Sequence, residues 1–364
     1  MTVTEYATAE GLPGEYWNAD PPDPRSSRAW LTANRWPEDG VRFLEIPGAG
    51  AACAVRAQDD HSGFPRMNCT EVTAGAGRDV AQPEGDLEEA RAEGRRQLNV
   101  CALGYGQSVF PAAGAEFDAD ALVTALEEYA RTQGRLLTFL HLDEDDPVLP
   151  CLRDRGWSVG VTDHYFRIAD VGEDQDAYLA GLSAHRRRRL RRELASLDEA
   201  GASAEIHRGD EVTEEIQREV ARLEACSDEK HGIPGDPARL LRVNERLRLA
   251  FGARYRVTLV RDRHGTAVAS STSVLGTRDV LLRMVGLGPG SEEIGAYFHV
   301  AYHQPVRLAR DTGARRVLLS TGTATPKLRR GATARPLLSA VPPGAPAHTA
   351  LLRRTDAAFA ALTA

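Results

Sequence analysis

Hydrophobic positions along this chain recur at helical spacing in some segments and form short continuous runs in others. The apolar side chains of the segment 118–133 fall on one helical face, with Asp118 or Asp120 as the expected N-cap and Gly134 after the last turn. The run 136–142 is apolar throughout and predicts a buried strand. The same criteria predict a strand and turn over 41–55, a charged helix over 78–96, a strand over 98–110, a short helix over 148–155, a strand pair over 157–168, helices over 177–200, 212–227, 237–251, 294–311 and 326–330, and strands over 203–207, 255–262, 266–275, 280–287, 314–320 and 337–341.

The order of these elements predicts a mixed α/β sheet rather than a doubly wound parallel one. Runs of antiparallel strands are followed by a helix, a strand, a short helix and a last strand. A chain of 364 residues also exceeds the size at which one hydrophobic core stops growing, so we expect two domains. The expected organisation is an irregular N-terminal arm over 1–40, an N-terminal domain over 41–170, a C-terminal domain over 171–345 and a tail helix over 346–364.

Composition indicates an ordinary globular protein of the cytoplasm. Hydrophobic residues make up 42% and charged residues 27% of the chain, and no stretch approaches the roughly 18 apolar residues that cross a bilayer. The first residues are acidic and proline-rich, unlike a secretory leader. The five cysteines are odd in number and widely spaced, which argues against a disulfide framework or a thiolate zinc site. We expect no membrane association.

The net charge of −7 excludes indiscriminate binding to polyanions but conceals two basic segments. Six arginines stand within Arg186–Arg192, and eight basic residues stand against one acidic residue between His303 and Arg335. One interpretation is a solvated, ion-paired surface. The other is a local phosphate-binding surface. The candidate nucleic-acid or phosphate contacts are Arg186, Arg189, Arg315, Arg316, Arg329 and Arg330.

The hexapeptide Arg283–Gly288 has the spacing R-x-x-G-x-G of a coenzyme A pyrophosphate loop. The helix that should follow it directly begins several residues later. Glu292 and Glu293 precede that helix, and their carboxylates would repel a pyrophosphate there. The pattern therefore argues against a coenzyme site of the usual kind.

Two further patterns could hold a metal ion, and both favour another interpretation. His299 and His303 are four residues apart, but no H-E-x-x-H pattern and no third ligand accompany them. The acidic run 143–146 more simply caps a helix that begins near Pro147, where negative charge meets the positive end of the helix. We expect no metal site.

Small residues dominate the segment Thr321–Ala332, which follows one strand and precedes the last. They leave room for a molecule to approach the backbone, and Lys327 supplies a cation at the rim. The alternative is a polar loop with a solvated lysine. A second loop, Lys230–Gly235, separates two helices and carries His231.

Three sequence segments, in this order along the chain, resemble those of one family. These are the segment Cys151–Trp157, the segment Tyr178–Ser183 with Arg186 and Arg189 after it, and the helix Tyr297–Gly313 followed by a strand and by Lys327 with Gly331 four positions on. Together they resemble the Fem-type branch of the GNAT fold, whose peptidoglycan-building members comprise two tandem GNAT-like domains. The resemblance covers most of the chain and implies two such domains, each a mixed, mostly antiparallel sheet flanked by helices.

The chain also departs from the family pattern. Aromatic residues flank the family's lysine–glycine element, whereas Pro326 and Arg330 stand here, and no long coiled-coil arm is inserted in the second half. Lys230–Gly232 and Lys327–Ala332 look closer to other bacterial GNAT-like acyltransferases. A substrate other than a peptidoglycan precursor is therefore expected.

The resemblance implies amide formation, in which an amine attacks an activated acyl group. By this match Lys327 is the oxyanion or phosphate partner, and His303 and Tyr302 are the other catalytic candidates. Arg283, Tyr297 and His303 lie on the strand and helix that border the cleft of GNAT folds. The general base could be His231, His303, Tyr302 or the donor itself. The candidate substrate contacts are Arg283, Tyr297, Lys230, His231, Thr323 and Arg335.

The expected function is an N-acyltransferase with no tightly bound cofactor. Its donor is an aminoacyl-tRNA and its acceptor an amine of a small molecule or peptide, in a biosynthetic step of specialised metabolism. A GNAT enzyme that uses acyl-coenzyme A or a carrier-protein thioester is the first alternative. A non-catalytic binding protein on the same fold is the second.

Overall fold

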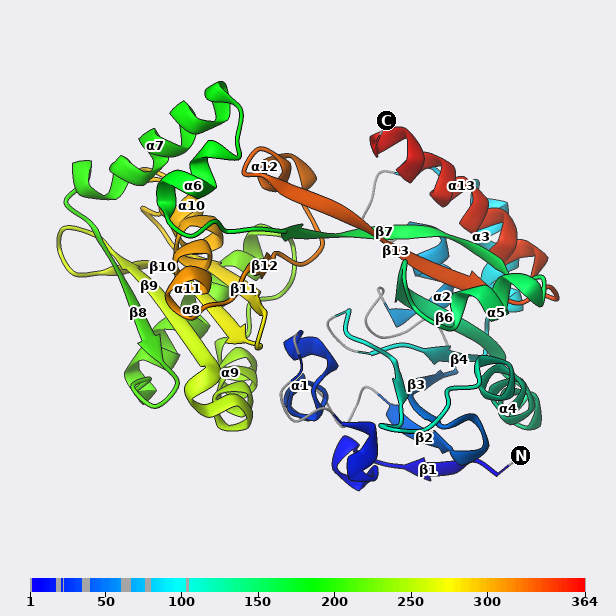
Figure 1. Cartoon of the computed structure of the whole chain (residues 1–364). Helices are drawn as coiled ribbons and strands as arrows, with labels where there is room; N and C mark the ends of the chain where they lie inside the picture. Colours follow the sequence, from blue (N-terminus) through cyan, green and yellow to red (C-terminus); the bar gives the residue numbers. More distant parts are fainter. Residues whose placement is uncertain are drawn as a thin grey trace. The chain divides into compact units, whose positions relative to one another are not determined.

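We describe a computed structural model of the chain, covering residues 2–17, 21, 23–34, 40–59, 67–75, 80–102 and 105–363. The chain forms two compact units (Figure 1). Unit 1 comprises Met1–Ala19, Arg35–His164 and Arg335–Ala364, and unit 2 comprises Asp20–Asn34 and Tyr165–Ala334. Both the N-terminal and the C-terminal segments of the chain thus belong to unit 1, and unit 2 includes a short piece of the expected N-terminal arm.

Unit 1 is built on a mostly antiparallel sheet in the order β1-β2-β3-β4-β6-β13, and the single parallel pair in this order is β4 with β6. Helix α4 connects the two parallel strands. Its N-cap is Asp118, whose carboxylate accepts from the backbone N–H of Ala121, and Gly134 follows its end with a φ of 59°. The elements are β1 (Thr4–Tyr6), η1 (Ala9–Gly11), η2 (Gly14–Tyr16), β2 (Val41–Ile46), η5 (Pro47–Ala49), β3 (Ala51–Gln58), α2 (Cys69–Thr73), α3 (Glu84–Glu93), β4 (Gln97–Val100), β5 (Val109–Pro111), α4 (Ala119–Thr132), β6 (Leu136–Asp143), α5 (Leu149–Asp154) and α13 (Pro346–Thr363), together with parts of β7 (Ser158–Ile168) and β13 (Ala332–Val341).

Unit 2 repeats this plan in the order β8-β9-β10-β11-β12-β7, and its single parallel pair is β11 with β12. The connection between the parallel strands is again helical. It consists of α10, a π-helical segment η8 and α11. The elements are η3 (Pro24–Ser26), α1 (Arg28–Asn34), α6 (Gln175–Ala180), α7 (Ala184–Glu199), β8 (Ser203–Arg208), α8 (Glu214–Lys230), α9 (Pro237–Phe251), η7 (Gly252–Arg254), β9 (Tyr255–Arg261), β10 (Ala267–Leu275), β11 (Asp279–Leu287), α10 (Ala296–Phe298), η8 (His299–His303), α11 (Gln304–Asp311), β12 (Arg316–Leu318) and α12 (Ala324–Leu328).

Helices cover both faces of the unit 2 sheet, as successive residues of β11 indicate. Val285 packs in an apolar cluster with Val300 of η8, whereas Gly286 lies directly against Leu223 of α8. Neighbouring residues of a strand point to opposite faces, so η8 and α8 lie on opposite sides of the sheet. This mixed, mostly antiparallel sheet with helices on its faces confirms the expected fold class.

The structure corrects several predicted elements. The expected helix 177–200 is two helices, because the chain turns at Gly181 and Ser183 caps α7 by accepting from the N–H of Arg186. The strand pair 157–168 is one long strand, β7, and the strand 98–110 is two, β4 and β5. The charged helix 78–96 is the shorter α3, and its expected start at Arg78 lies outside the described residues.

The acidic run 143–146 does stand at a helix start, as the sequence predicts. The Asp146 carboxylate accepts from the N–H of Val148, one residue before α5 begins. Burial raises the pKa of this carboxyl to about 6. Within the described ranges, no helix is long and apolar enough to cross a bilayer.

Both units contain the same unusual backbone feature beside their parallel strand pair. In unit 1 the last parallel partners are Val100 and Phe139, and His141, two residues later, has a φ of 59°. In unit 2 the last partners are Leu281 and Leu318, and Ser320, again two residues later, has a φ of 62°. Few residues other than glycine adopt this left-handed conformation. The two halves therefore share a local kink as well as a strand order.

Candidate functional site

The candidate site lies in unit 2, where β11 and β12 stop pairing. Beyond Leu318 the chain turns at Ser320, and the short helix α12 brings Lys327 back to this turn. The Lys327 ammonium donates to the carbonyl oxygens of Ser320, at 3.0 Å, and Thr321, at 2.5 Å. Its nitrogen also lies 4.9 Å from the centre of the Phe166 ring. Carbonyl dipoles and an aromatic face orient an ammonium group without cancelling its charge.

Arg330, one turn after Lys327, is almost completely buried, with 1% of its surface exposed. Its guanidinium forms a bidentate ion pair with Glu193 of α7, with Nε 3.1 Å from Oε2 and Nη2 2.6 Å from Oε1. Nη1 donates to the Pro326 carbonyl at 2.8 Å. The group also stacks on the rings of Phe298 and Tyr302, at 4.0 and 4.6 Å. The position that departs from the family pattern is thus an interior anchor of α12.

Glu193 is the centre of this network. Arg189 Nε lies 3.1 Å from its Oε1, and His303 Nε2 lies 3.5 Å from its Oε2. Burial opposes ionisation of this carboxyl, but the nearby His303 ring and the charge of Arg330 lower its pKa. The Nε2–H of His299 donates to the Glu193 carbonyl oxygen at 2.6 Å. The arrangement therefore holds α7, η8 and α12 together.

Both histidines of η8 are neutral at physiological pH. Burial, with a further contribution from His303, lowers the pKa of His299 to about 4. Burial also lowers the pKa of His303, although Glu193 opposes the shift. Their rings lie 5.1 Å apart, and the described residues include no group of three or more metal-ligating side chains.

Tyr302 and Tyr297 contact each other beside Arg330. Their hydroxyl oxygens are 3.1 Å apart, and their rings meet edge to face at 5.8 Å. Burial and the neighbouring Tyr297 raise the pKa of Tyr302, so its hydroxyl keeps its proton at neutral pH. In this environment Tyr302 is a hydrogen-bonding group and not a ready proton acceptor.

Arg283 belongs to a second buried cluster, on the other face of the sheet. Its Nη1 lies 3.2 Å from Asn244 Oδ1 and 3.5 Å from Glu224 Oε1. Glu224 also accepts from Asn244 Nδ2 at 2.8 Å and from Thr272 Oγ1 at 3.2 Å. Burial raises the pKa of Glu224 despite the charge of Arg283. The cluster fixes Arg283 on the side of the sheet that α8 and α9 cover.

The two glycines of the R-x-x-G-x-G pattern allow α8 to approach the sheet closely. A Cβ on Gly286 would lie 2.5 Å from Ser270 Oγ and 2.7 Å from the Glu224 backbone nitrogen. A Cβ on Gly288 would lie 2.7 Å from a methyl group of Leu223. Helix packing therefore accounts for both glycines.

The remaining sequence candidates do not join these clusters. Lys230 pairs with Glu292 at 3.3 Å, and Arg316 forms a bidentate pair with Asp279. Arg335 belongs to unit 1, where it pairs with Glu144 and Asp145. The exposed candidates are His231, Thr323, Arg186, Arg315 and Arg329.

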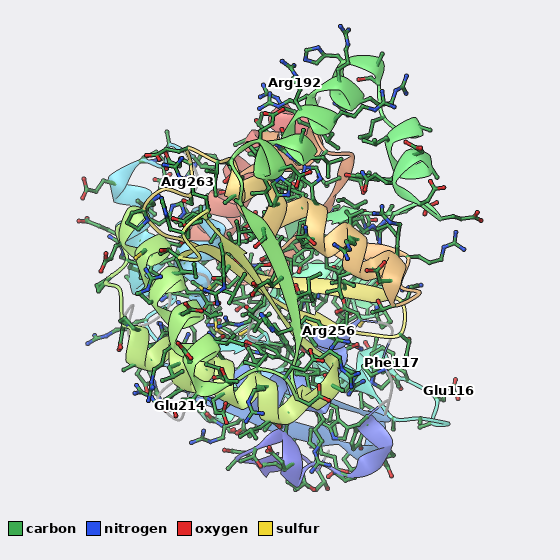
Figure 2. All side chains as sticks on the ribbon, turned by 90° about the vertical axis from the view of Figure 1, so that its left-hand side faces the viewer. Glu116, Phe117, Arg192, Glu214, Arg256 and Arg263 are labelled. Carbon is green, nitrogen blue, oxygen red and sulfur yellow. The ribbon has the colours of Figure 1, made fainter. Side chains whose placement is uncertain are left out.

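Helix α7 presents most of its arginines to solvent. Figure 2 shows Arg192 at the outer surface of this helix. Arg186, Arg188 and Arg191 are also exposed, whereas Leu190 and Glu193 face inward. The basic run is therefore an outer cationic surface backed by one buried carboxylate.

Sequence reasoning did not select Glu193, Glu224, Asn244, Phe166 or Phe298. A signal was present for Glu193, because it stands three residues after Leu190 and four before Leu197, on the apolar face of α7. For the other four, the sequence contains no comparable signal, since their contacts come from distant elements.

Comparison with known proteins identifies the family. Residues 106–349, well over half of the chain, match the FemAB-like family of peptidoglycan biosynthesis and recognition. No curated protein matches the sequence.

Three solved structures share the fold. FemX has a TM-score of 0.57 and 10% sequence identity, over 93% of this chain and 97% of its own. L-PGS from Bacillus licheniformis has a TM-score of 0.53 and 12% identity, over 87% and 89% of the two chains. A conserved protein of unknown function from Bacteroides thetaiotaomicron has a TM-score of 0.54 and 12% identity, over 86% and 89%. The chain shares the fold of these structures, and it belongs to the FemAB-like family.

Proposed function

We propose that this protein transfers an aminoacyl group from an aminoacyl-tRNA to the amine of a small molecule or peptide. The amine nitrogen attacks the ester carbonyl carbon, so that a C–N bond forms and the carbonyl oxygen becomes an oxyanion. The intermediate collapses by breaking the bond to the ribose oxygen. That oxygen leaves as a hydroxyl, with the proton that the amine gives up. The products are an amide and free tRNA.

The observation that carries this proposal is the Lys327 ammonium beside the point where β11 and β12 stop pairing. Two backbone carbonyls accept hydrogen bonds from this ammonium at 3.0 and 2.5 Å. The ion pair of Arg330 with Glu193 fixes α12, the helix that carries Lys327. A cation that is already oriented stabilises a developing oxyanion without reorganising during the reaction. We assign Lys327 this role.

The composition of the chain supports the assignment. Of the 45 basic residues only two are lysines, Lys230 and Lys327. Arginine is otherwise the basic residue of this protein, yet the site beside Ser320 holds a lysine. A compact ammonium fits between two carbonyls, whereas a planar guanidinium has another shape and another donor pattern.

Helix α7 supports a polyanionic donor. Its exposed arginines stand on an element that Glu193 ties to α12, the helix of Lys327. Phosphate contacts from this surface would position a tRNA without reading its sequence. We assign Arg186 and its exposed neighbours this role.

The proton of the attacking amine needs an acceptor. Tyr302 keeps its own proton, and His303 is buried against Glu193. We therefore propose that the amine loses its proton to the donor itself or through water. His231 remains the exposed imidazole near the end of α8.

The competing donor is an acyl-coenzyme A. It would need phosphate contacts other than those of the usual R-x-x-G-x-G loop, since α8 packing accounts for both glycines of that pattern here. The decisive experiment incubates the full chain with charged tRNAs or acyl-coenzyme A donors and a panel of amines, and detects amides by mass spectrometry.

We expect an amide product that ribonuclease treatment of the donor abolishes. Product from acyl-coenzyme A, insensitive to ribonuclease, would reject the tRNA donor. Lys327→Met should lower turnover, and Leu328→Met is its matched control, because Leu328 is an exposed neighbour on the same helix. Equal activity of the two variants would reject the role of Lys327.

A further inference from the structure

Unit 2 contains a cavity that the proposed reaction does not use. Its volume is about 360 Å³, and it lies among α6, α7, β8, η8 and α11. This size is within the range of small-molecule sites in proteins. Neither Lys327 nor Arg283 lines it.

Four side chains that line the cavity carry buried polar atoms without a hydrogen-bond partner in the described part of the chain. These atoms are Gln175 Nε2, Arg310 Nη1, Gln304 Oε1 and His303 Nε2. Gln304 is 9% exposed, so this carbonyl oxygen is also largely removed from solvent. A buried polar group without a partner costs free energy, and several around one cavity indicate that something polar completes the site.

The first two of these atoms belong to a joined pair of planar groups. Arg310 Nη2 donates to Gln175 Oε1 at 2.8 Å. This bond brings the guanidinium and the carboxamide together and leaves one donor nitrogen on each group without an acceptor. A carboxylate has two oxygens in one plane and accepts from two such donors at once.

Charge around the cavity also favours an anion. Arg307 and Arg310 line it, against a single carboxylate, Asp198. Burial lowers the pKa of Arg310, although the nearby charges of Asp311 and Asp174 oppose the shift, and a bound anion would offset the effect of burial. His299 and His303, both neutral, form part of the wall.

The other wall atoms define the rest of the ligand. Gln304 Oε1 and the Asp198 carboxylate are acceptors, so they require an N–H or O–H donor on the ligand. Leu194 and Leu197 supply apolar surface for a short carbon skeleton. We propose that this cavity binds a small carboxylate that also carries an N–H or O–H group, such as a hydroxy acid or an amino acid.

Isothermal titration calorimetry of the full chain with L-malate tests the proposal. We expect malate to bind with a Kd of about 1 mM or lower. The diamide of malate has nearly the same shape but no charge, and it should not bind. Arg310→Met should weaken malate binding at least about tenfold, since it removes a charge-assisted hydrogen bond. Gln175→Leu, at a partly exposed position, should also weaken it.

Arg263→Gln is the matched control, because Arg263 is an exposed arginine outside the cavity (Figure 2). The affinity of the Arg263→Gln variant for malate should equal that of the unaltered chain. Absence of malate binding would overturn the proposal, and water would then be the hydrogen-bond partner of the buried polar groups. Equal binding of the diamide, or tighter binding of inorganic phosphate, would overturn the carboxylate assignment. Unchanged binding in both Arg310→Met and Gln175→Leu would place malate elsewhere.

Discussion

Arg330 and Glu193 form a bidentate ion pair in the interior of unit 2, with contacts of 3.1 and 2.6 Å, although they stand 137 positions apart in the chain. The pair ties the basic helix α7 to the lysine helix α12. Removing Glu193 would leave the Arg330 charge buried without a counter-ion, and removing Arg330 would leave Glu193 with Arg189 as its ion-pair partner. Either loss is far more costly than losing an exposed pair.

Glu193→Leu and Arg330→Met should each lower the free energy of unfolding by about 3–5 kcal/mol. The double variant should lose less than the sum of the two, because neither charge is then left alone. Urea denaturation of the four proteins measures this coupling. Additive losses would show that the two side chains act independently.

The lowered pKa of His299 predicts that the folded protein loses stability in mild acid. Its folded pKa of about 4 lies below the ordinary value of 6.5, so the unfolded chain takes up a proton first as the pH falls. This proton uptake by the unfolded chain does not affect stability above pH 6.5, and it lowers the free energy of unfolding by about 3 kcal/mol near pH 4. Gln in place of His299 retains an N–H donor for the Glu193 carbonyl and does not titrate. The stability difference between the two proteins should therefore change over this pH range, and a constant difference would contradict the prediction.

Lys327 should not be replaceable by arginine. We expect both Lys327→Met and Lys327→Arg to lower turnover by roughly 10²–10³, the usual effect of losing one oxyanion donor. The loss in the arginine variant reports on geometry, because arginine keeps the charge but cannot occupy the position of the lysine ammonium. Steady-state kinetics measures the effect, with Leu328→Met alongside. Full activity of the arginine variant would show that charge alone suffices.

Gly286→Ala should destabilise unit 2 by about 1–3 kcal/mol, because the added methyl group overlaps the α8 backbone. Thermal or urea unfolding measures the loss. Gly290→Ala is an unsuitable control, since its φ is positive, whereas Gly85→Ala adds a methyl group in open space. If Gly286→Ala left stability unchanged but weakened acyl-coenzyme A binding, the packing explanation would be wrong.

The arginines of α7 should govern the salt dependence of tRNA binding. Arg186→Gln combined with Arg192→Gln should weaken binding and make the slope of log K against log salt shallower by about two, one for each lost phosphate contact. Filter binding over a range of salt concentrations measures the slope. Arg263→Gln should leave it unchanged, and an equal slope in the double variant would place the phosphates elsewhere.

Sequence patterns predicted those parts of the fold that depend on local chemistry. The helix Pro237–Phe251 has its boundaries as predicted, with Asp236 as its cap and Gly252 after its end. The error at 177–200 has a local cause as well. Ser183 is a strong capping residue, and a cap between two helical stretches indicates two helices.

The candidate site was less predictable, because its geometry depends on contacts between distant elements. The sequence selected Lys327 as a candidate but not the carbonyls that hold it, and it treated Arg330 as a phosphate contact although the residue is an interior anchor. The arginine run suggested a surface, and the structure places the buried Glu193 behind its outward arginines. Long-range pairing of charges leaves no periodicity to recognise in one sequence.

The paired kinks at His141 and Ser320 bear on the ancestry of the chain. A left-handed non-glycine residue costs about 1–2 kcal/mol, and nothing in a strand order requires it. If the two halves had arisen independently, each would have acquired this costly conformation at the same position, two residues after the last paired residue of its parallel strands. A single ancestral half that already had the kink, later duplicated and fused, explains both copies. The first half would then have kept this backbone framework although the lysine of the candidate site stands only in the second.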